Sequence, residues 1–408
     1  MTGHHGSGPK YALLVGDGMA DYPLAQLDGK TPLEVAHTPN MDRIAACRVG
    51  LVNTVPPGMA PGSDVANLSL LGYDPALCRT GRAPFEAASM GIALGKRDVA
   101  FRMNLVTLDP RSGREIVMVS HNAGDISTQE GRAIVETLKR DLVLSGVRIH
   151  AGVAYRHLMV WEDGPVMAKT IPPHDVLDQN MTSYLNPEER DPVVDVIRLS
   201  WNLLKEHPIN IERMKKGLKA ANSVWLWGQG RALEIPLFRD RFGLKGGVIS
   251  AVDLLKGIGV YAGFKSIAVE GATGYLDTNY SGKAQEALTA LTDLDFIFVH
   301  VEAPDEASHS GDVGDKIQAI ESFDEKVVGA VMRGLEQFTE YRIMVASDHF
   351  TPISIKTHAS DPAPFAWADK GELASGKKGV PFTEASAKAS GLQFEKGYDL
   401  MPSFLGQA

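Results

Sequence analysis

The chain has 408 residues, of which 44% are hydrophobic and 22% are charged, as is typical of a globular protein with a sizeable core. Its 41 basic and 50 acidic residues give a net charge of −9, which argues against nucleic acid as a partner. Only Cys47 and Cys78 occur and no apolar run approaches the length of a membrane span, so we expect no disulfide framework, no membrane partner and a cytoplasmic location.

Short apolar runs that end in small and polar residues predict the core of the chain. The first is "KYALLVGDG", which is typical of a buried strand followed by a loop. Later runs repeat this pattern, and helical patterns such as "DKIQAIESFDEKVVGAVMRGLEQF" stand between them. Strands that alternate with helices indicate an α/β fold with a mostly parallel sheet covered by helices on both faces. The later strands are predicted in "SVWLWGQG", "FKSIAVEGATG", "LDFIFVHVEAPD" and "YRIMVASDH".

The middle of the chain has a different pattern. "FRMNLVTLDPRSGREIVMV" predicts a hairpin, "STQEGRAIVETLKRDL" predicts an amphipathic helix, and "VRIHAGVAYRHLMVW" predicts further strand. Together they predict a smaller α+β domain at residues 99–187, inserted into a discontinuous core formed by residues 1–98 and 188–408.

Acidic and histidine residues follow several of the predicted strands, and parallel sheets place their sites at these strand ends. Asp305 and His309 are four residues apart, so on a helix they would share one face and could bind one ion. Each of these residues alone is also explained as a helix cap, a loop residue or a surface residue. The prediction of a metal site therefore depends on all of them together. Mixed carboxylate and imidazole ligands favour two divalent ions such as Mn, Co, Zn or Fe over Mg. The predicted ligands from these segments are Asp17, Asp305, His309, Asp348, His349 and His358.

A further ligand is predicted in "PPGMAPGSDVANLSLLGYDP", where Ser63 precedes a helical pattern. The structural interpretation of Ser63 is a helix N-cap. The functional interpretation uses the same position, because the amino end of a helix favours a phosphate and a metal there would activate the hydroxyl as a nucleophile. Both interpretations stay open.

Six motifs in order along the chain carry a resemblance to a known family. They are "GDGMAD", "TPNMDRIA", "PGSDVANLSLLGYDP", "APDEASHSGD", "SDHFTP" and "KTHASDPAPF". The chain resembles the archaeal-type, cofactor-independent phosphoglycerate mutases of the alkaline phosphatase superfamily, and "FRMNLVT" and "YRHLMVW" extend the resemblance into the inserted segment. Some relatives carry the label homoserine kinase, so the resemblance leaves the phosphate acceptor open.

The resemblance implies a role for each predicted ligand. Ser63 would attack the phosphate of 3-phosphoglycerate, and the resulting phosphoserine would return the phosphate to the 2-hydroxyl of glycerate without 2,3-bisphosphoglycerate. One ion would be bound by three residues and the other by four, which are Asp305, His309 and His358, and Asp17, Ser63, Asp348 and His349.

An anionic substrate also needs cationic side chains. Arg102 and Arg156 of the insertion, which would act as a lid, are predicted to bind the substrate carboxylate. Arg231, after "SVWLWGQG", resembles a phosphate-binding arginine, and His157 is predicted to move protons. Most arginines and lysines in such a chain are solvated surface residues, which is the alternative for each of these predictions. Further candidates are Arg79, Arg82 and Lys245.

Other functions also remain open. The same site would be a phosphatase if water accepted the phosphate, or a kinase if another alcohol did. A metal-binding protein without catalysis is a third hypothesis, although such a protein has no use for an activated Ser63. The identity of the metals and the oligomeric state, a homo-oligomer included, also stay open.

Overall fold

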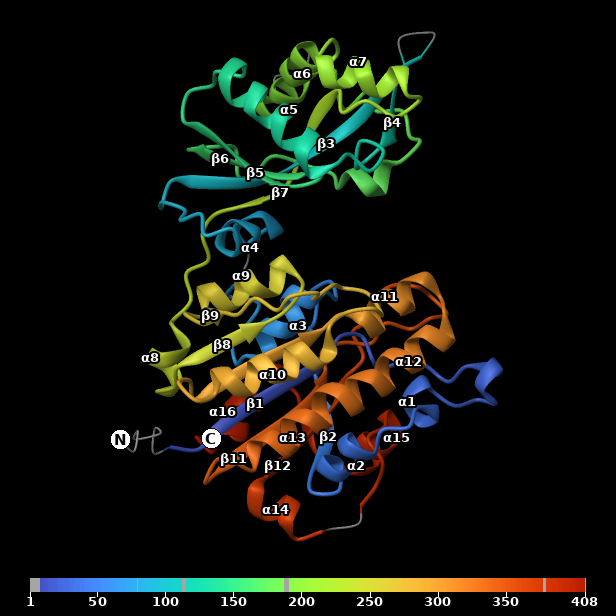
Figure 1. Cartoon of the computed structure of the whole chain (residues 1–408), viewed down its shortest axis with the longest axis vertical. Helices are drawn as coiled ribbons and strands as arrows, with labels where there is room; N and C mark the ends of the chain where they lie inside the picture. Colours follow the sequence, from blue (N-terminus) through green and yellow to red (C-terminus); the bar gives the residue numbers. More distant parts are fainter. Residues whose placement is uncertain (1–7, 79, 112–114, 187–190, 377–378, 408) are drawn as a thin grey trace. The chain divides into compact units, whose positions relative to one another are not determined.

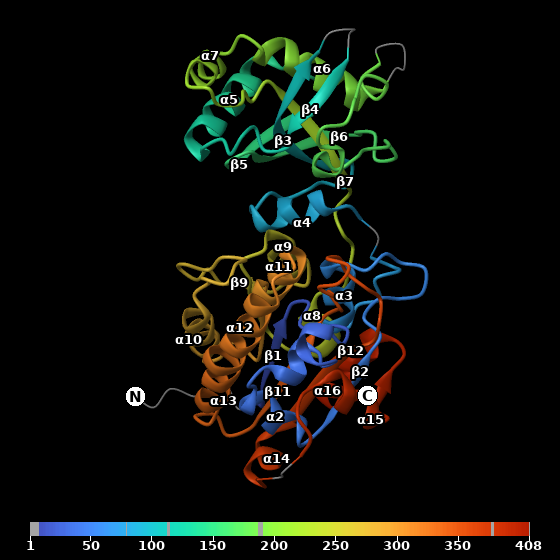
Figure 2. The ribbon, with the colours of Figure 1, turned by 90° about the vertical axis from the view of Figure 1, so that its right-hand side faces the viewer.

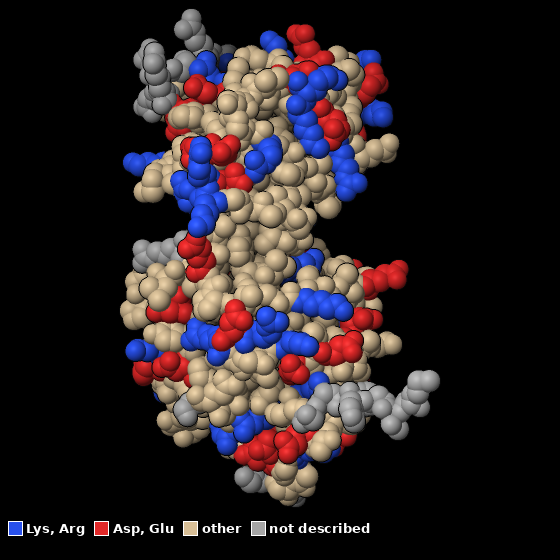
Figure 3. Space-filling view, turned by 90° about the vertical axis from the view of Figure 1, so that its left-hand side faces the viewer, with Lys and Arg blue, Asp and Glu red and all other residues tan. Residues whose placement is uncertain are grey.

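The structure is a computed structural model that describes residues 8–78, 80–111, 115–186, 191–376 and 379–407. It divides into two compact units, the first formed by Met1–Arg79 and Glu234–Ala408 and the second by Thr80–Leu233 (Figure 1). None of the described helices combines the length and the apolar character that crossing a membrane requires. Acidic and basic side chains are interspersed over the face of each unit shown in Figure 3.

An eight-stranded sheet forms the centre of the first unit, with the strand order β13-β2-β12-β11-β1-β10-β8-β9. The central strands β11, β1, β10 and β8 are parallel to one another, and β12 runs antiparallel to β11 and β2. The predicted α/β fold with a mostly parallel sheet is therefore confirmed. The strands are β1 (Lys10–Gly16), β2 (Val49–Val52), β8 (Gly246–Ile249), β9 (Lys265–Ser266), β10 (Phe296–Val301), β11 (Tyr341–Ser347), β12 (Ala363–Asp369) and β13 (Gln393–Phe394).

Helices cover both faces of this sheet because alternate residues of its buried strands point to opposite sides. On one face Leu14 and Val299 pack into a core with residues of α2 (Pro39–Ala45), α10 (Tyr280–Ala290), α12 (Val313–Phe323) and α13 (Gly329–Leu335). On the other face Tyr11 contacts Phe404 and Phe296 contacts Phe238. These partners belong to α16 (Leu400–Leu405) and α8 (Phe238–Phe242), which are labelled in Figure 2. The remaining helices of this unit are α1 (Pro32–Val35), α3 (Ser63–Leu70), α9 (Asp253–Tyr261), α11 (Ala303–Ser310), α14 (Lys370–Ala374) and α15 (Glu384–Ala389).

The second unit has its own antiparallel sheet and its own hydrophobic core. Its longest strand, β3 (Asp98–Pro110), pairs with β4 (Ile116–Ser120), β6 (Arg156–Glu162) and β7 (Ser223–Gly230). The predicted hairpin, amphipathic helix and further strands are all present. The other elements are α4 (Arg82–Ser89), α5 (Thr128–Asp141), β5 (Val147–Val153), α6 (Pro192–Leu204) and α7 (Pro208–Lys215).

Two strand predictions are wrong in part. "SVWLWGQG" is β7, which belongs to the second sheet and not to the parallel core, because it pairs antiparallel with β3 from Val106 to Ala100. Since this strand lies near the end of the second unit, the unit spans residues 80–233, wider than the predicted 99–187. In "FKSIAVEGATG" only Lys265–Ser266 forms a strand, at the edge of the sheet. The role of the inserted segment as a lid stays a prediction.

Candidate metal centre

The carboxyl ends of three neighbouring strands lie side by side in the sheet of the first unit. Strand β1 pairs in parallel with both β10 and β11, so the three strands end side by side. Asp17 follows the last residue of β1, and Asp348 follows the last residue of β11. After β10 the chain enters α11, which carries Asp305 and His309 on one face. The predicted clustering of these residues at the carboxyl ends of strands is thus what the fold produces.

Asp305, His309 and His358 form the first group of possible metal ligands. His309 Nε2 lies 3.1 Å from Asp305 Oδ2 and 3.1 Å from His358 Nε2, and His358 Nε2 lies 3.5 Å from Asp305 Oδ1. His309 Nδ1 lies 3.0 Å from the carbonyl oxygen of Lys356, to which it can donate, and this contact leaves Nε2 for an ion. Burial alone would raise the pKa of Asp305, but hydrogen bonds with the two histidines hold it well below its usual range.

Asp17, Ser63, Asp348 and His349 form the second group. His349 Nε2 lies 3.4 Å from Asp17 Oδ1, 3.6 Å from Asp348 Oδ2 and 3.3 Å from Ser63 Oγ. Thr351 joins the two groups, because its hydroxyl lies 3.1 Å from His349 Nδ1 and donates to Asp305 Oδ1 at 2.6 Å. All seven predicted ligands therefore belong to one connected cluster.

The backbone at Gly18 allows this close approach. Gly18 has a φ of 58°, and a Cβ atom there would collide with the side chains of Thr351 and Asp305. Its N–H donates to Asp348 Oδ1 at 3.1 Å. Glycine is therefore required directly after Asp17.

The donor set fits divalent metal ions. Asp17 is fully buried, yet neither of its carboxylate oxygens has a hydrogen-bond partner among the described residues. Burial and the nearby carboxylates of Asp348 and Asp305 hold the pKa of Asp17 well above its usual range. Because an unpaired buried carboxylate is costly, a cation is the natural partner. Ligands that bind one ion at about 2.0–2.2 Å lie roughly 3 Å apart, which is close to the spacings within both groups.

Ser63 is the first residue of α3, and Gly62 is its N-cap. None of the described side chains makes a capping hydrogen bond at this helix end, so the N-cap interpretation of Ser63 is wrong. The hydroxyl instead faces His349, and Asn67, one turn later, donates to Ser63 O at 2.9 Å and to Asp348 Oδ2 at 2.8 Å. The position of Ser63 leaves the nucleophile interpretation as the one that uses its side chain.

Several residues of the cluster were not predicted. His300 lies inside β10, is fully buried and places Nε2 3.0 Å from Asp17 Oδ2. Glu302 lies behind it, and burial together with Asp305 raises the pKa of Glu302 to about 8. The only sequence signal for His300 was an ionisable residue inside an apolar run, five positions before Asp305. Asn67 could have been found from its i, i+4 spacing to Ser63.

Three of the predicted arginines gather in the second unit. The Arg102 guanidinium lies 4.0 Å from the centre of the Trp227 ring, and its Nε lies 2.9 Å from Glu86 Oε1. Burial lowers the pKa of Arg102, and the like charges of Arg82 and Arg156 act in the same direction. Arg82 and Arg156 are exposed. This cationic cluster (Arg82, Arg102 and Arg156) is a candidate anion-binding site within the second unit.

The other predicted substrate residues lie elsewhere or are occupied. His157 is buried, accepts the N–H of Gly152 at its Nδ1, and has a pKa lowered by burial to about 4. Its role in proton transfer stays a prediction. Lys245 directly precedes β8, so it lies at the amino ends of the parallel strands, whereas the candidate metal ligands lie at their carboxyl ends. Arg231 follows β7 of the second unit and donates to Lys96 O at 2.9 Å. Arg79 lies outside the described residues.

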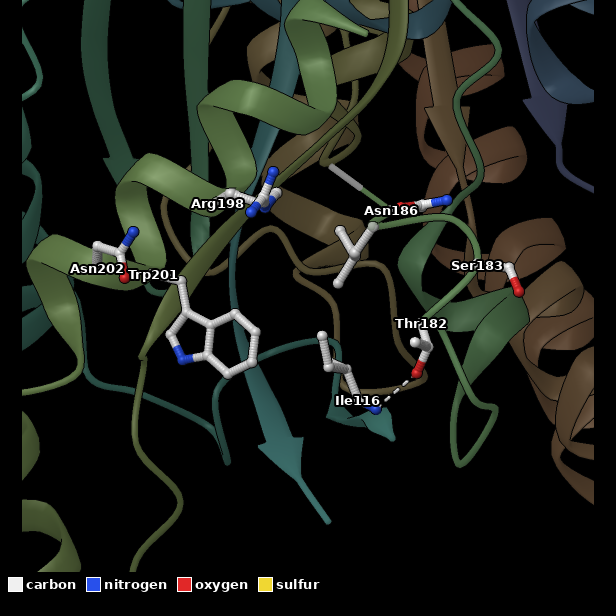
Figure 4. Close-up of a pocket in the computed structure, with 8 residues that line it drawn as sticks. Ile116, Thr182, Ser183, Asn186, Arg198, Trp201 and Asn202 are labelled. Carbon is white, nitrogen blue, oxygen red and sulfur yellow. Dashed lines mark hydrogen bonds between the residues drawn. The ribbon is translucent and has the colours of Figure 1, made fainter. Parts of the chain in front are cut away.

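A pocket of about 550 Å³ opens on the second unit (Figure 4). Among the described residues that line it, Arg198 is the charged one, and the backbone N–H of Ile116 donates to Thr182 Oγ1 across one wall. None of the candidate metal ligands is among the described residues that line this pocket, which lies in the second unit.

Comparisons with known proteins agree with this geometry. Residues 45–210 match the family described as 2,3-bisphosphoglycerate-independent phosphoglycerate mutase, and residues 174–391 match type I phosphodiesterase / nucleotide pyrophosphatase. The 2,3-bisphosphoglycerate-independent phosphoglycerate mutase of Methanothrix thermoacetophila is 50% identical over 96% of this chain and 98% of its own length. A probable enzyme of the same name from Geobacter sulfurreducens is 48% identical over 97% of this chain and 99% of its own.

Solved structures show the same fold. The PH0037 protein from Pyrococcus horikoshii superposes with a TM-score of 0.80 at 30% identity, over 98% of both chains. The cofactor-independent phosphoglycerate mutase from Thermoplasma acidophilum superposes with a TM-score of 0.60 at 24% identity, over 98% of this chain and 99% of its own.

Proposed function

Because the chain belongs to the family of 2,3-bisphosphoglycerate-independent phosphoglycerate mutases, we propose that it interconverts 3-phosphoglycerate and 2-phosphoglycerate. The protein would then be an isomerase that acts by phosphoryl transfer, at a step shared by glycolysis and gluconeogenesis. Its substrate is a small phosphorylated acid, and no 2,3-bisphosphoglycerate is required. We expect the reaction to take place in the cytoplasm.

The observation that carries the proposal is the position of Ser63. Its hydroxyl stands at the amino end of α3, 3.3 Å from His349 Nε2 and next to buried Asp17 and Asp348. A structural ion needs no hydroxyl in this place. Free N–H groups in the first turn of α3 favour a phosphate at the same point.

The proposed reaction has two phosphoryl transfers. Ser63 Oγ forms a bond to phosphorus as the bond to the 3-oxygen of glycerate breaks, and the serine proton ends on that oxygen. Glycerate then turns, its 2-oxygen takes the phosphoryl group, and Ser63 recovers a proton from the 2-hydroxyl. Two bound divalent ions, Mn, Co or Zn in preference to Mg, would lower the pKa of the hydroxyl and offset the charge of the phosphate.

The protein's own residues orient the nucleophile. Asn67 donates to both Ser63 O and Asp348 Oδ2, so it fixes the start of α3 relative to the ligand cluster. Thr351 contacts His349 Nδ1 and thereby directs Nε2 towards Ser63. In the second unit, the cationic cluster is proposed to bind the carboxylate of glycerate.

The proposal is tested by an enolase-coupled assay with 3-phosphoglycerate and Mn²⁺, without 2,3-bisphosphoglycerate. We expect steady formation of phosphoenolpyruvate. A homoserine kinase or a phosphatase would instead give phosphohomoserine from an added phosphate donor, or free phosphate. Absence of mutase turnover in metal-loaded, folded protein would contradict the proposal.

A further inference from the structure

His300 is a fully buried ionisable residue beside the candidate metal ligands. It lies on β10 opposite Val15 of β1, two residues before Asp17, so both side chains point to the same side of the sheet. Its side chain is fully buried, and Nε2 lies 3.0 Å from Asp17 Oδ2. The second oxygen of Asp17, Oδ1, faces His349 at 3.4 Å. The two oxygens of one carboxylate therefore face two different histidines.

The close pair of atoms is not a hydrogen bond. Neither His300 Nε2 nor either oxygen of Asp17 has a hydrogen-bond partner among the described residues, although all three atoms are buried. Two buried polar atoms 3.0 Å apart without a hydrogen bond are arranged as ligands of one ion are, since such ligands lie roughly 3 Å apart. Ligand atoms of Asp17, His300 and Asp348 all lie within 4.8 Å of one another.

The other side of the His300 ring is held as in a metal-binding histidine. Nδ1 lies 3.4 Å from Ser250 Oγ and 3.7 Å from Glu302 Oε2. Ser250 Oγ is itself fixed, because it accepts the N–H of Val252 at 3.0 Å. The fully buried Lys283 donates to the carbonyl oxygen of His300 at 3.1 Å and fixes the backbone. Histidine ligands usually bond their second ring nitrogen to such a partner, which orients the ring.

We propose that His300 is a metal ligand, whose Nε2 binds a divalent ion together with Asp17 and Asp348. This inference rests on the proposed metal site and adds to it a buried imidazole that neither the motifs nor the family resemblance assigned. The ion would then be bound by two imidazole nitrogens, one from His300 and one from His349. Such a donor set strengthens the preference for Mn, Co or Zn over Mg.

The test measures metal binding without substrate. Metal-free wild type and His300→Gln are titrated with Co²⁺, with affinity and stoichiometry from calorimetry and coordination from the visible absorption of bound Co²⁺. Glutamine keeps a similar reach and a hydrogen-bonding group but removes the imidazole. His300→Glu replaces the nitrogen with an anionic oxygen ligand. Thermal unfolding of each metal-free variant checks that it folds.

We expect His300→Gln to lose about 100-fold or more in affinity for one ion, because removal of an orienting partner alone typically costs about 10–100-fold. The absorption of bound Co²⁺ should change, and His300→Glu should recover affinity to within about tenfold of wild type. The matched control is His150→Gln in the second unit. His150 Nε2 is also buried and has no hydrogen-bond partner in the part of the chain that the structure describes, but the nearby charges are the cations Arg148 and Lys139.

The proposal is overturned if His300→Gln binds every ion within about tenfold of wild type. A weaker affinity with unchanged Co²⁺ absorption also overturns it, since His300 would then only position Asp17. Neither result depends on mutase turnover. A wild type that binds metal through His300 but lacks mutase activity would reject the proposed function alone, and an active enzyme with an unaffected variant would reject this inference alone.

Discussion

At the scale of single residues, Ser63 separates catalysis from stability. Its hydroxyl makes no capping hydrogen bond, so Ser63→Ala should change the free energy of unfolding by less than the ~1 kcal/mol of a lost cap while it abolishes turnover. Intact-mass measurement should show a phosphate adduct in substrate-treated wild type and none in the variant. Ser69→Ala in the same helix is the matched control.

Ser69 is buried and donates to Thr54 O at 2.5 Å, so Ser69→Ala should cost about 1 kcal/mol and keep turnover. The same change from serine to alanine is therefore expected to have opposite effects at the two positions. Ser63→Ala loses turnover and keeps stability, whereas Ser69→Ala loses stability and keeps turnover. Substantial mutase activity in Ser63→Ala would eliminate the phosphoserine intermediate.

A buried ion pair joins α12 to the loop beside the site that carries Asp21. Lys316 Nζ lies 2.8 Å from Asp21 Oδ2, and both side chains are fully buried. Lys316 also donates to Thr351 O at 3.0 Å. Lys316→Met leaves a buried charge without its partner, so we expect a loss of about 3–5 kcal/mol in the free energy of unfolding, measured by chemical denaturation. Lys215→Ala removes the exposed pair with Glu212 and should have little effect on the free energy of unfolding. Equal effects of the two variants would contradict this account.

At the scale of elements, helix α5 predicts a pH dependence. Ser127 and Glu130 form a capping box at its start, and Arg213, with a side chain only 4% exposed, lies 2.9 Å from Glu130 Oε2. Burial alone would raise the pKa of Glu130, but bonds from Ser127 and Arg213 lower it overall. A carboxyl with a lowered pKa stabilises the fold above its unfolded pKa of about 4.3, and this contribution is lost as the pH falls through the folded value.

Glu130→Gln should therefore lower the free energy of unfolding by about 1–2 kcal/mol at neutral pH and by progressively less in acid. Urea denaturation followed by tryptophan fluorescence can measure this, because four of the five tryptophans, Trp161, Trp201, Trp225 and Trp227, lie in the second unit. Glu136→Gln, in the same helix with an exposed Lys139 partner, is the control and should show little effect. A difference between wild type and Glu130→Gln that is constant with pH would be the contrary result.

The core strands could be predicted because each is an apolar run that ends in small or polar residues. The same rule misplaced β7, since Trp225 and Leu226 are fully buried in the second sheet and give the pattern of a central strand. Local pattern contains no information on which sheet a buried strand joins. Pairing with β3, more than a hundred residues away in the sequence, decides it.

The clustering of the candidate metal ligands could be predicted for a related reason. Asp17 and Asp348 directly follow strands, and Asp305 and His309 have helical spacing, so geometry follows from position. His300 lies inside a strand, where only the neighbouring chain reveals what its side chain faces. The sequence offers Lys245 as a candidate only because it is a cation. Its position at the amino end of β8, away from the candidate ligands, follows from the parallel pairing of β8 with β10.

At the scale of the whole molecule, the candidate ligands come from segments far apart in the sequence, so we expect ions to bind the folded first unit and not the unfolded chain. Metal should therefore stabilise this unit, by about 2.7 kcal/mol at a free concentration of 100 times Kd. EDTA should abolish turnover and lower the unfolding temperature, and Mn²⁺ or Co²⁺ should restore both. The tryptophan-rich second unit, which has a separate core, serves as the internal reference. Full activity in metal-stripped protein would reject metal dependence.

The balance between mutase and phosphatase turnover depends on how long glycerate stays bound while Ser63 carries the phosphate. Water at roughly 55 M is always the rival acceptor, so only an alcohol held at high effective concentration can compete. We propose that Arg102 and Arg156 of the second unit bind the glycerate carboxylate. Wild type should then release little inorganic phosphate during turnover. Loss of one charged hydrogen bond, about 1.5–3 kcal/mol, predicts a rise of roughly tenfold or more in the ratio of phosphate release to mutase turnover in Arg156→Ala.

Arg102→Ala should act in the same direction, although part of its charge is already offset by Glu86 at 2.9 Å and its side chain packs on Trp227. Arg156 is exposed, so its removal is the cleaner test of substrate binding. Arg198→Ala is the matched control, because this arginine of the same unit lines the pocket of Figure 4 instead. The phosphoserine would still form in both cluster variants, so phosphate must appear as mutase product declines. If neither substitution changes the ratio, or if wild type mainly liberates phosphate, the cationic cluster does not retain glycerate and water is the physiological acceptor.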